Sequence, residues 1–248
     1  MTKSFLSDRN REIILGSLLG DGSLRIQKPY RNARFSFRHS IHQAEYFFWK
    51  VQQLKEISSE HAYWKQEPDG FSLACKIRYQ SVAREVLTKL NKFTHYHNHL
   101  FIRRKWLNML TPLSLAIWWC DDGSLISNSR KGVFCTDGFD FDGVEKIVQY
   151  LHVVWKIDCK VGRISLQGKR ATQYRIWIRS TEELKKFLRI ILPFVPVCSM
   201  LPKVLILYND SQLQQRWISE VKELSHFSEE TIDYYLNQKR LKWRRFRE

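Results

Sequence analysis

The stretch IILGSLLGDGSL at residues 13–24 returns in altered form as SLAIWWCDDGSLI at residues 114–126. Both copies are apolar runs that end on Asp-Gly-Ser-Leu, and their carboxylates Asp21 and Asp122 are 101 positions apart. The segments IRYQSVAREVLTKL (77–90) and IRSTEELKKFLRII (178–191) show the same offset. Two segment pairs with one offset predict duplicated halves related by a pseudo-twofold axis. Asp21 and Asp122 are then expected to face each other across that axis.

The spacing of apolar residues predicts the elements of each half. For the first half we expect helices over 11–20, 43–57 and 81–91 and strands over 33–39, 61–66 and 71–79. For the second half we expect helices over 114–122, 141–155 and 181–191 and strands near 132–137, 158–166 and 172–179. With one further strand in each half, to which we assign no bounds, each half is αββαββα in outline. The fold class is α+β, with helices on one face of each antiparallel sheet.

Glycines mark the first copy of the repeat. Gly22 lies just past the helix at 11–20 and is expected to be a left-handed cap. Gly16 and Gly20 lie four residues apart on one helix face, where they allow another helix to approach closely. The second copy has Ile117 and Asp121 at these places, so its helix must pack differently.

The domain organisation follows from the repeat. We predict a first half at 1–100, a second half at 101–204 and a basic helical extension at 205–248, with a linker over about 92–112. Within the extension, LQQRWISEVKELSHF (213–227) has helical spacing. The last ten residues, KRLKWRRFRE, contain six cations and one carboxylate, which fits either a solvated end or an arm that contacts phosphates.

Composition limits the class of protein. The chain has 248 residues, is 44% hydrophobic and 14% aromatic, and is therefore expected to fold into a packed globule. It has no apolar run of the ~18–20 residues that span a bilayer, and its charged N-terminus argues against a secretion signal. The five cysteines show no metal-binding spacing and are interpreted as reduced, mostly buried thiols: Cys75, Cys120, Cys135, Cys159 and Cys198. We expect an intracellular protein without membrane association, in an organelle or a bacterial cytoplasm.

The charge points to a polyanionic partner. Lysine and arginine number 41 against 25 acidic residues, which leaves a net charge of +16. In the strand at 33–39, Ala33, Phe35 and Phe37 share an apolar face while Arg34 and Arg38 share the polar one. Similar faces and the nearby loop supply the candidate DNA-binding residues Arg25, Lys28, Arg31, Arg34, Arg38, Lys76, Arg78, Gln173, Arg175 and Arg179.

A cationic two-stranded ribbon fits the major groove of DNA, where arginine and lysine bind guanine edges and Gln173 would read adenine. The expected partner is therefore double-stranded DNA over a long asymmetric site. RNA stays open, because a basic sheet does not by itself distinguish the two nucleic acids.

The paired aspartates indicate cleavage chemistry. A single Asp-Gly is usually a turn or a helix cap, but here each one ends a matched apolar helix at the offset of the repeat. Helix ends already carry partial negative charge, so Asp21 and Asp122 together would need a cation. Mg²⁺, or Mn²⁺ or Ca²⁺ at the same site, fits two carboxylates and phosphate oxygens and supports phosphodiester hydrolysis.

The two runs resemble the paired motifs of the LAGLIDADG homing endonucleases, in the single-chain branch with two motifs, over roughly residues 10–204. The resemblance implies an intron-encoded, monomeric, Mg²⁺-dependent enzyme that cuts both strands of a long DNA site. It also implies two αββαββα halves whose sheets form a DNA-binding saddle and whose motif helices pack side by side.

The resemblance further assigns site residues. The metal-binding acids of the family correspond to Asp21 and Asp122, preceded by Gly20 and Asp121. CSMLPKV (198–204) resembles a late lysine motif and makes Lys203 catalytic. Its first-half counterpart falls among Arg103, Arg104 and Lys105, of which we choose Lys105.

Two other functions remain open. An RNA maturase would use the same fold to assist intron splicing, and a DNA-binding regulator would not cut at all. We do not favour zinc binding by His95, His97 and His99, because no acid or cysteine lies near them in the sequence. His39 and His42 are interpreted as polar surface or phosphate contacts, and Trp118 and Trp119 as core residues of the apolar helix at 114–122.

Overall fold

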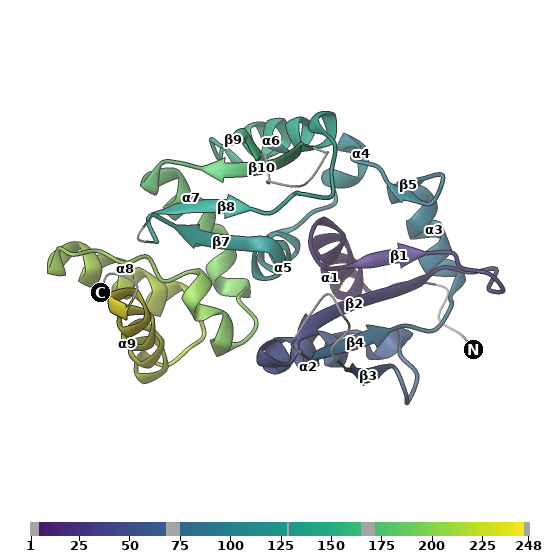
Figure 1. The fold of residues 1–248 in the computed structure, drawn as a ribbon, viewed down its shortest axis with the longest axis horizontal. Coiled ribbons are helices and arrows are strands. Elements are labelled where there is room, and N and C mark those ends of the chain that lie inside the picture. Colours follow the sequence, from purple (N-terminus) through teal and green to yellow (C-terminus); the bar gives the residue numbers. More distant parts are fainter. Residues whose placement is uncertain (1–4, 68–74, 128, 165–171, 246–248) are drawn as a thin grey trace. The chain divides into compact units, whose positions relative to one another are not determined.

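The computed structural model describes residues 5–67, 75–127, 129–164 and 172–245 (Figure 1). The predicted turn at Pro68, Asp69 and Gly70 lies outside the described residues. The chain forms two compact units, Met1–Asp121 and Asp122–Glu248, which we call the N-terminal and the C-terminal unit. The three predicted domain ranges stay predictions.

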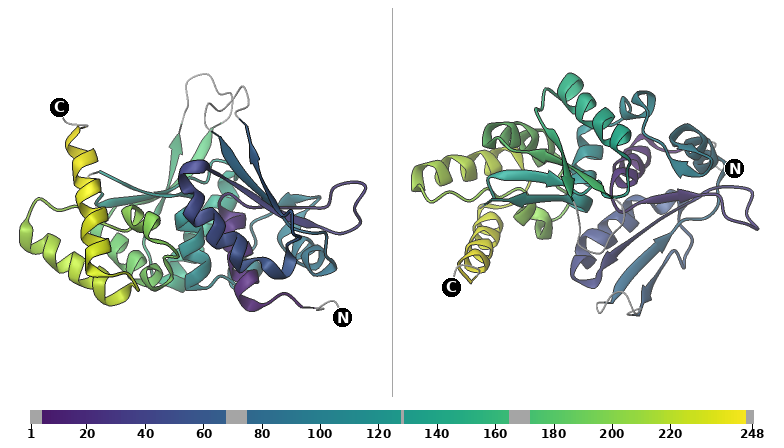
Figure 2. Two further views of the ribbon diagram at one scale, coloured as in Figure 1. Left: turned by 90° about the horizontal axis from the view of Figure 1, so that it is seen from below. Right: turned by 45° about the horizontal axis from the view of Figure 1, so that its top comes forward.

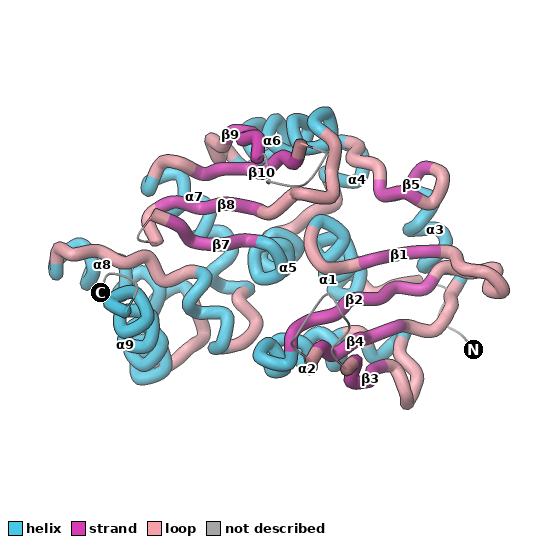
Figure 3. Tube along the Cα trace, viewed as in Figure 1, coloured by secondary structure: helices cyan, strands magenta, loops and turns pink. Residues whose placement is uncertain are grey.

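The N-terminal unit combines helices with one antiparallel sheet (Figures 1 and 3). Its strands are β1 (Ser23–Arg25), β2 (Arg34–Ser40), β3 (Tyr63–Gln66) and β4 (Lys76–Gln80), in the order β1-β2-β4-β3. Its helices are α1 (Asp8–Leu19), α2 (Ala44–Gln53), α3 (Glu85–Thr94), α4 (Arg104–Leu107) and α5 (Pro112–Asp122). Short 3₁₀ turns and a small hairpin complete it: η1 (Ile41–Gln43), η2 (Lys55–Ile57), β5 (His95–Tyr96) and β6 (His99–Leu100).

Buried and more exposed residues alternate along β2 and β4 of this sheet. Phe35 and Phe37 are buried on one face of β2, and Phe37 stacks on Tyr79 of β4. Helices α2 and α3 pack on strands of the sheet. On the opposite face Arg38 pairs with Arg78, so the predicted division into an apolar and a cationic face is confirmed.

The C-terminal unit repeats this arrangement (Figure 2). Its strands are β7 (Gly123–Ile126), β8 (Lys131–Phe134), β9 (Lys160–Ile164) and β10 (Gln173–Ile178), in the order β7-β8-β10-β9. Its helices and 3₁₀ turns are α6 (Phe141–Trp155), α7 (Thr181–Ile191), η3 (Leu192–Phe194), η4 (Cys198–Lys203), α8 (Ser211–Leu224) and α9 (Glu229–Arg245). The capping side chains of Asp140 and Ser180 accept hydrogen bonds at the starts of α6 and α7. The matching strand orders confirm the α+β fold and the duplication.

The strand register shows that the second pair of repeat segments, 77–90 and 178–191, was aligned with the wrong offset. Ser23 pairs with Ser36, and the equivalent Ser124 pairs with Val133, so the halves are offset by 97 positions from β2 onward rather than 101. The connection between β1 and β2 covers residues 26–33, whereas the one between β7 and β8 covers only 127–130. Those four extra residues account for the change of offset. The sequence also assigned no bounds to β1 and β7, which are too short to show alternation.

Helix α1 is enclosed along most of its length, as its all-round apolar character predicts. The Ser7 side chain accepts from the Asn10 N–H and caps its start, and every residue from Ile13 to Leu19 is buried. The expectation of a left-handed cap at Gly22 is wrong, because its φ lies outside the left-handed region. Its N–H instead donates to the Ser17 carbonyl over 2.6 Å, and a Cβ there would lie 2.7 Å from that oxygen. A close backbone approach, not a positive φ, requires this glycine.

The predicted core residues Trp118 and Trp119 are fully buried, which confirms their assignment. All five cysteines are free thiols. The expectation that they are mostly buried is wrong, since only Cys120 is buried and the other four are half-buried. Among the described residues, no helix has the length and apolar character needed to cross a membrane.

Candidate functional site

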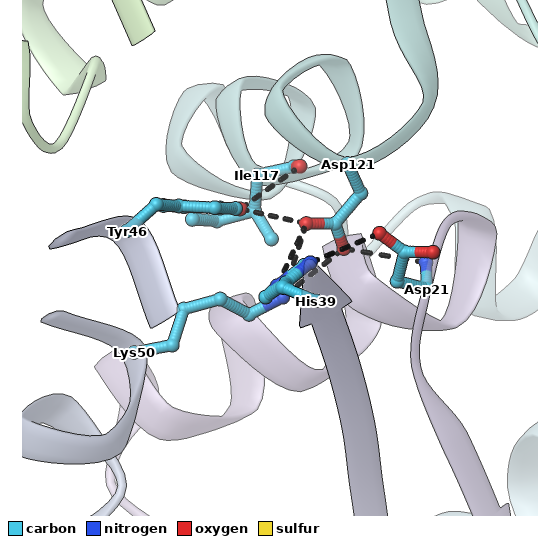
Figure 4. A network of polar contacts seen from close by, with 6 residues as sticks. All are labelled: Asp21, His39, Tyr46, Lys50, Ile117 and Asp121. Carbon is cyan, nitrogen blue, oxygen red and sulfur yellow. Dashed lines mark hydrogen bonds and ion pairs between the residues drawn. The ribbon is translucent and has the colours of Figure 1, made fainter. Parts of the chain in front are cut away.

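Three side chains with metal-ligand chemistry meet in the N-terminal unit (Figure 4). Asp21 follows the end of α1, Asp121 lies in the last turn of α5, and His39 lies near the end of β2. His39 Nδ1 is 3.2 Å from Asp21 Oδ2, and its Nε2 is 3.9 Å from Asp121 Oδ1. One possible ligand atom from each residue lies within 4.8 Å of the others. The cluster therefore offers two carboxylates and an imidazole to one small volume.

The interpretation of His39 as polar surface is wrong, because its side chain is fully buried. The alternation that places Phe35 and Phe37 on the apolar face reaches residue 39 two positions later, so the sequence did contain the signal. The imidazole packs against the rings of Phe37 and Tyr46. Neither ring nitrogen has a hydrogen bond of acceptable geometry among the described residues.

Asp121 is surrounded by donors. Lys50 Nζ lies 3.1 Å from both carboxylate oxygens, and the Tyr46 hydroxyl donates to Oδ1 over 2.8 Å. A longer contact of 3.4 Å joins the Asp21 N–H to Oδ2. The Lys50 and Asp121 side chains are both fully buried. Burial and the nearby Asp121 charge raise the pKa of Tyr46, which keeps its hydroxyl a donor.

The two carboxylates of this cluster differ in their partners and their accessibility. Lys50 Nζ forms an ion pair with Asp121 over 3.1 Å, and both of these side chains are fully buried. Asp21 carries the accessible carboxylate, since 36% of its side chain is exposed. Asp121 balances Lys50 and Asp21 faces solvent, so the two acids have different surroundings.

Helices α1 and α5 touch at the two glycines of the first repeat copy. A Cβ on Gly16 would lie 2.3 Å from the Ser114 carbonyl oxygen, and one on Gly20 would lie 2.5 Å from the Asp121 Cβ. Ile117 also borders Gly16, so the larger residues of α5 fill the space that the glycines of α1 leave. This confirms that the second copy packs differently from the first.

The C-terminal unit gathers another set of charged groups around Cys135. The Asp122 carbonyl accepts the Cys135 N–H over 3.0 Å, and the Asp122 side chain is half-buried. Burial raises the pKa of the Cys135 thiol, with negative charge at Asp122 and Asp137 acting in the same direction and positive charge at Arg175 and Lys203 opposing it. Predicted catalytic Asp122 and Lys203 therefore share one neighbourhood.

The other predicted catalytic lysine has a different setting. Lys105 is exposed on α4, with Nζ 5.5 Å from the centroid of the Phe93 ring. The cation that the structure buries beside the N-terminal acids is Lys50, which sequence reasoning missed because it looks like an ordinary surface lysine of an amphipathic helix. The roles of Lys105 and Lys203 stay predictions, as does the convergence of Asp21 and Asp122.

A profile of the LAGLIDADG DNA endonuclease family matches residues 11–187, a stretch that includes both Asp-Gly motifs. The chain belongs to this family. Within it, the preceding residue differs between the motifs: Gly20 has no side chain to offer, and Asp121 is bonded to Lys50.

Curated relatives of this LAGLIDADG chain carry different names. Protein RecA of Mycobacterium gastri is 26% identical over 234 residues, which cover 88% of this chain and 52% of the relative. DNA endonuclease I-ChuI of Chlamydomonas applanata is 27% identical over 209 residues, covering 78% and 93%. Cytochrome b mRNA maturase bI2 of Saccharomyces cerevisiae is 25% identical over 201 residues, covering 74% and 44%. The chain spans about half the length of the RecA relative.

A solved structure shares the fold. The homing endonuclease I-WcaI, determined bound to its DNA recognition sequence, superposes with a TM-score of 0.71 at 19% identity. The match covers 84% of this chain and 91% of I-WcaI, so the fold likeness extends through most of both proteins.

The polar face of the N-terminal sheet forms a hollow of about 320 Å³ next to Asp21. Its lining includes four of the predicted DNA-binding residues: Arg25, Arg34, Arg38 and Arg78. Lys28 and Arg31 are exposed in the connection between β1 and β2, and Lys76 is half-buried on β4. The hollow joins the accessible carboxylate to a cationic surface.

Some of the predicted DNA-binding side chains already have protein partners. Arg34 donates to the Ser81 carbonyl over 2.9 Å, and Arg78 lies over the exposed ring of Trp64, a surface aromatic that sequence reasoning missed. Arg175 forms two bonds of 2.7 Å with Asp137.

On the C-terminal sheet, Arg179 is exposed just past β10, whereas Gln173 is half-buried with its Oε1 unpaired among the described residues. The DNA-binding assignment of the whole set stays a prediction.

The histidine-rich hairpin β5–β6 stands apart from this cluster. His95 is half-buried with Nδ1 2.8 Å from the Thr94 hydroxyl, and burial lowers its pKa to about 4. His97 and His99 are exposed. In the described part of the chain, the metal-capable group contains His39 instead of these three.

Proposed function

We propose that the chain is a site-specific endonuclease that hydrolyses both strands of a long, asymmetric DNA duplex. The observation that carries this proposal is the position of Asp21, which belongs both to the carboxylate–imidazole cluster and to the lining of the cationic hollow. A polyanion held against the arginines would have a phosphate near that carboxylate. The family of the chain and the structure of I-WcaI bound to its DNA recognition sequence support this substrate.

The donor set fits a divalent cation. His39 is buried, neither of its ring nitrogens forms a hydrogen bond within the described part of the chain, and two carboxylates lie beside it. Asp21 would be the main ligand, because it is accessible, while Lys50 competes for Asp121. Asp122 would be the matching ligand of the second motif. A cation such as Mg²⁺, Mn²⁺ or Ca²⁺, when bound, would lower the pKa of water and stabilise negative charge on the leaving oxygen.

The remaining residues have binding and positioning roles. Lys203 and Lys105 would neutralise phosphate oxygens near the two scissile bonds. Arg25, Arg34, Arg38 and Arg78 would hold the phosphate backbone or guanine edges of one half-site. In the other half-site Arg175 would act together with Asp137, since their bidentate pair fixes the guanidinium. The protein would work as a monomer inside the cell, with the two halves contacting unlike half-sites.

A plasmid assay tests the activity. The plasmid carries the two sequences that flank the coding insertion, joined as in an allele without it. Wild-type protein with Mg²⁺ or Mn²⁺ should convert supercoiled plasmid to the linear form, and EDTA should prevent this. Asp21→Asn and Asp122→Asn should bind the labelled duplex with unchanged affinity but lose cleavage by at least ~10³-fold, because ligands of the cation contribute several kcal/mol. Asp142→Asn, on an exposed position of α6, is the matched control.

Undiminished cutting by Asp21→Asn and Asp122→Asn would refute the assignment, as would cutting in EDTA. Affinity should fall steeply with salt, because several phosphates are neutralised. A flat salt dependence would show that the basic faces do not contact the backbone.

An RNA maturase is the second candidate, favoured by the relative that carries that name. RNA binding needs the basic sheets but not the acids, so the presence of Asp21 and Asp122 argues for the nuclease. Filter binding with the intron transcript and with the target duplex separates the two. Tighter binding of the transcript together with no cleavage would establish the maturase.

A further inference from the structure

Helix α9 packs against η4, the turn that ends in Lys203 (Figures 1 and 2). The N-terminal half contains no counterpart of this helix in its sequence. Ile232 and Leu236 are buried on one face of α9, and Tyr235 and Lys239 lie at neighbouring positions of that face. The C-terminal extension is thus part of the core around a predicted active-site residue.

Lys239 binds the backbone on both sides of Lys203. Its Nζ donates to the Pro202 carbonyl over 2.5 Å and to the Leu205 carbonyl over 2.7 Å. At the start of η4 the Tyr235 hydroxyl lies 3.6 Å from the Cys198 sulfur. Helix α9 therefore contacts both ends of the short segment that presents Lys203.

The environment of Lys239 differs from that of a surface lysine. Among the described residues no carboxylate forms an ion pair with it, and burial lowers its pKa to about 7. An ammonium has three N–H donors and an amine has two, so either form can serve both carbonyls. Both readings of the final ten residues, a solvated end or a phosphate-contacting arm, are wrong for Lys239. A desolvated lysine that donates to two carbonyls holds the backbone between them, and we call this pair of hydrogen bonds from Lys239 the brace.

We propose that Lys239 is a positioning residue that holds the Lys203 segment in place for cleavage of one DNA strand. This inference rests on the proposed nuclease function, in which Lys203 contacts a scissile phosphate. Because the first half has no equivalent of α9, loss of the brace should affect one strand and leave the other. The protein would then become a nicking enzyme.

The first test needs no DNA. Lys239→Met keeps the apolar stem and removes the donors. The amides of residues 199–201 and 203–205 should therefore exchange with deuterium faster, on the order of tenfold, because two hydrogen bonds are lost. Lys242→Met changes an exposed lysine of the same helix and should leave exchange unchanged. Unchanged exchange in Lys239→Met would overturn the brace. Thermal unfolding run in parallel verifies that the variants are folded.

The second test measures each strand. On a duplex labelled at both 5′ ends, Lys239→Met should lower the cleavage rate of one strand by about tenfold or more. The cleavage rate of the other strand should stay within twofold of wild type, so nicked product accumulates. Lys203→Met should slow the same strand. The double variant should be no slower than Lys203→Met alone, because the brace acts through that side chain. Affinity for the duplex should not change.

The other possible results of the strand assay would each overturn the proposal. Equal slowing of both strands would show a general structural role and overturn the proposal, and so would additive effects in the double variant. A wild-type protein that cuts neither strand would remove the proposed function and this role together. A wild-type protein that cuts, beside a Lys239→Met variant with an unchanged strand ratio, would remove this role alone.

Discussion

The two copies of the repeat differ most at the residue before the shared aspartate. In the first copy it is Gly20, which makes room for the facing helix; in the second it is Asp121, which occupies that room. The added carboxylate of the second copy is buried with Lys50 and Tyr46, whereas the shared Asp21 of the first copy reaches solvent. The two motifs therefore differ in their local environment at the position before the shared aspartate. The extra acid, Asp121, joins two segments through its buried contacts, and the shared acid, Asp21, has the accessible carboxylate.

The largest expected effect tests the buried contacts of Asp121. Lys50→Met should destabilise the protein by ~3–5 kcal/mol, because Asp121 would remain as a buried charge without its counter-ion. Urea-induced unfolding measures the loss, and Lys55→Met on the exposed surface of η2 is the control. Adding Asp121→Asn to Lys50→Met should recover part of the stability. A loss below ~1 kcal/mol would mean that water or another group satisfies Asp121.

A smaller effect tests the close contact of the helices. Gly16→Ala places a methyl group against the Ser114 carbonyl oxygen, and backbone cannot move aside as a flexible side chain can. We expect a destabilisation of ~1–3 kcal/mol, as for other overpacked sites. Gly138→Ala provides the matched control, since nothing lies within 4 Å of its added Cβ, and it should stay within ~0.5 kcal/mol. Equal unfolding midpoints for the two variants would show that α1 and α5 separate readily.

The smallest effect concerns the accessible acids. Asp21→Asn and Asp122→Asn should leave the metal-free protein within ~0.5 kcal/mol of wild type or slightly more stable, because each removes a negative charge near a helix end. The same variants should show a smaller rise of the melting temperature on addition of Mg²⁺ or Mn²⁺, since ligand binding stabilises the folded state. Differential scanning fluorimetry measures both quantities. A large loss of metal-free stability would assign these carboxylates to packing.

Sequence reasoning succeeded where a pattern repeats locally. Helices α6 and α7 have the predicted bounds, and the alternation of β2 separates Phe35 and Phe37 from Arg34 and Arg38. It failed at strands β1 and β7, whose three and four residues are too few for a period to show. His39 was within reach of the same alternation that placed Phe37 and was misassigned because histidine is usually treated as a surface residue.

The sequence by itself determined the duplication, the bounds of helices α6 and α7 and the place of each aspartate at the end of an apolar helix, because these depend on neighbours along the chain. Only the tertiary structure decided which charges are enclosed. Lys50 and Asp121 are 71 residues apart, and Lys239 reaches a carbonyl 37 residues before it. A lysine has the same local pattern whether its ammonium meets water, a carboxylate or a backbone carbonyl. Its environment is set by segments that folding brings together from far along the chain.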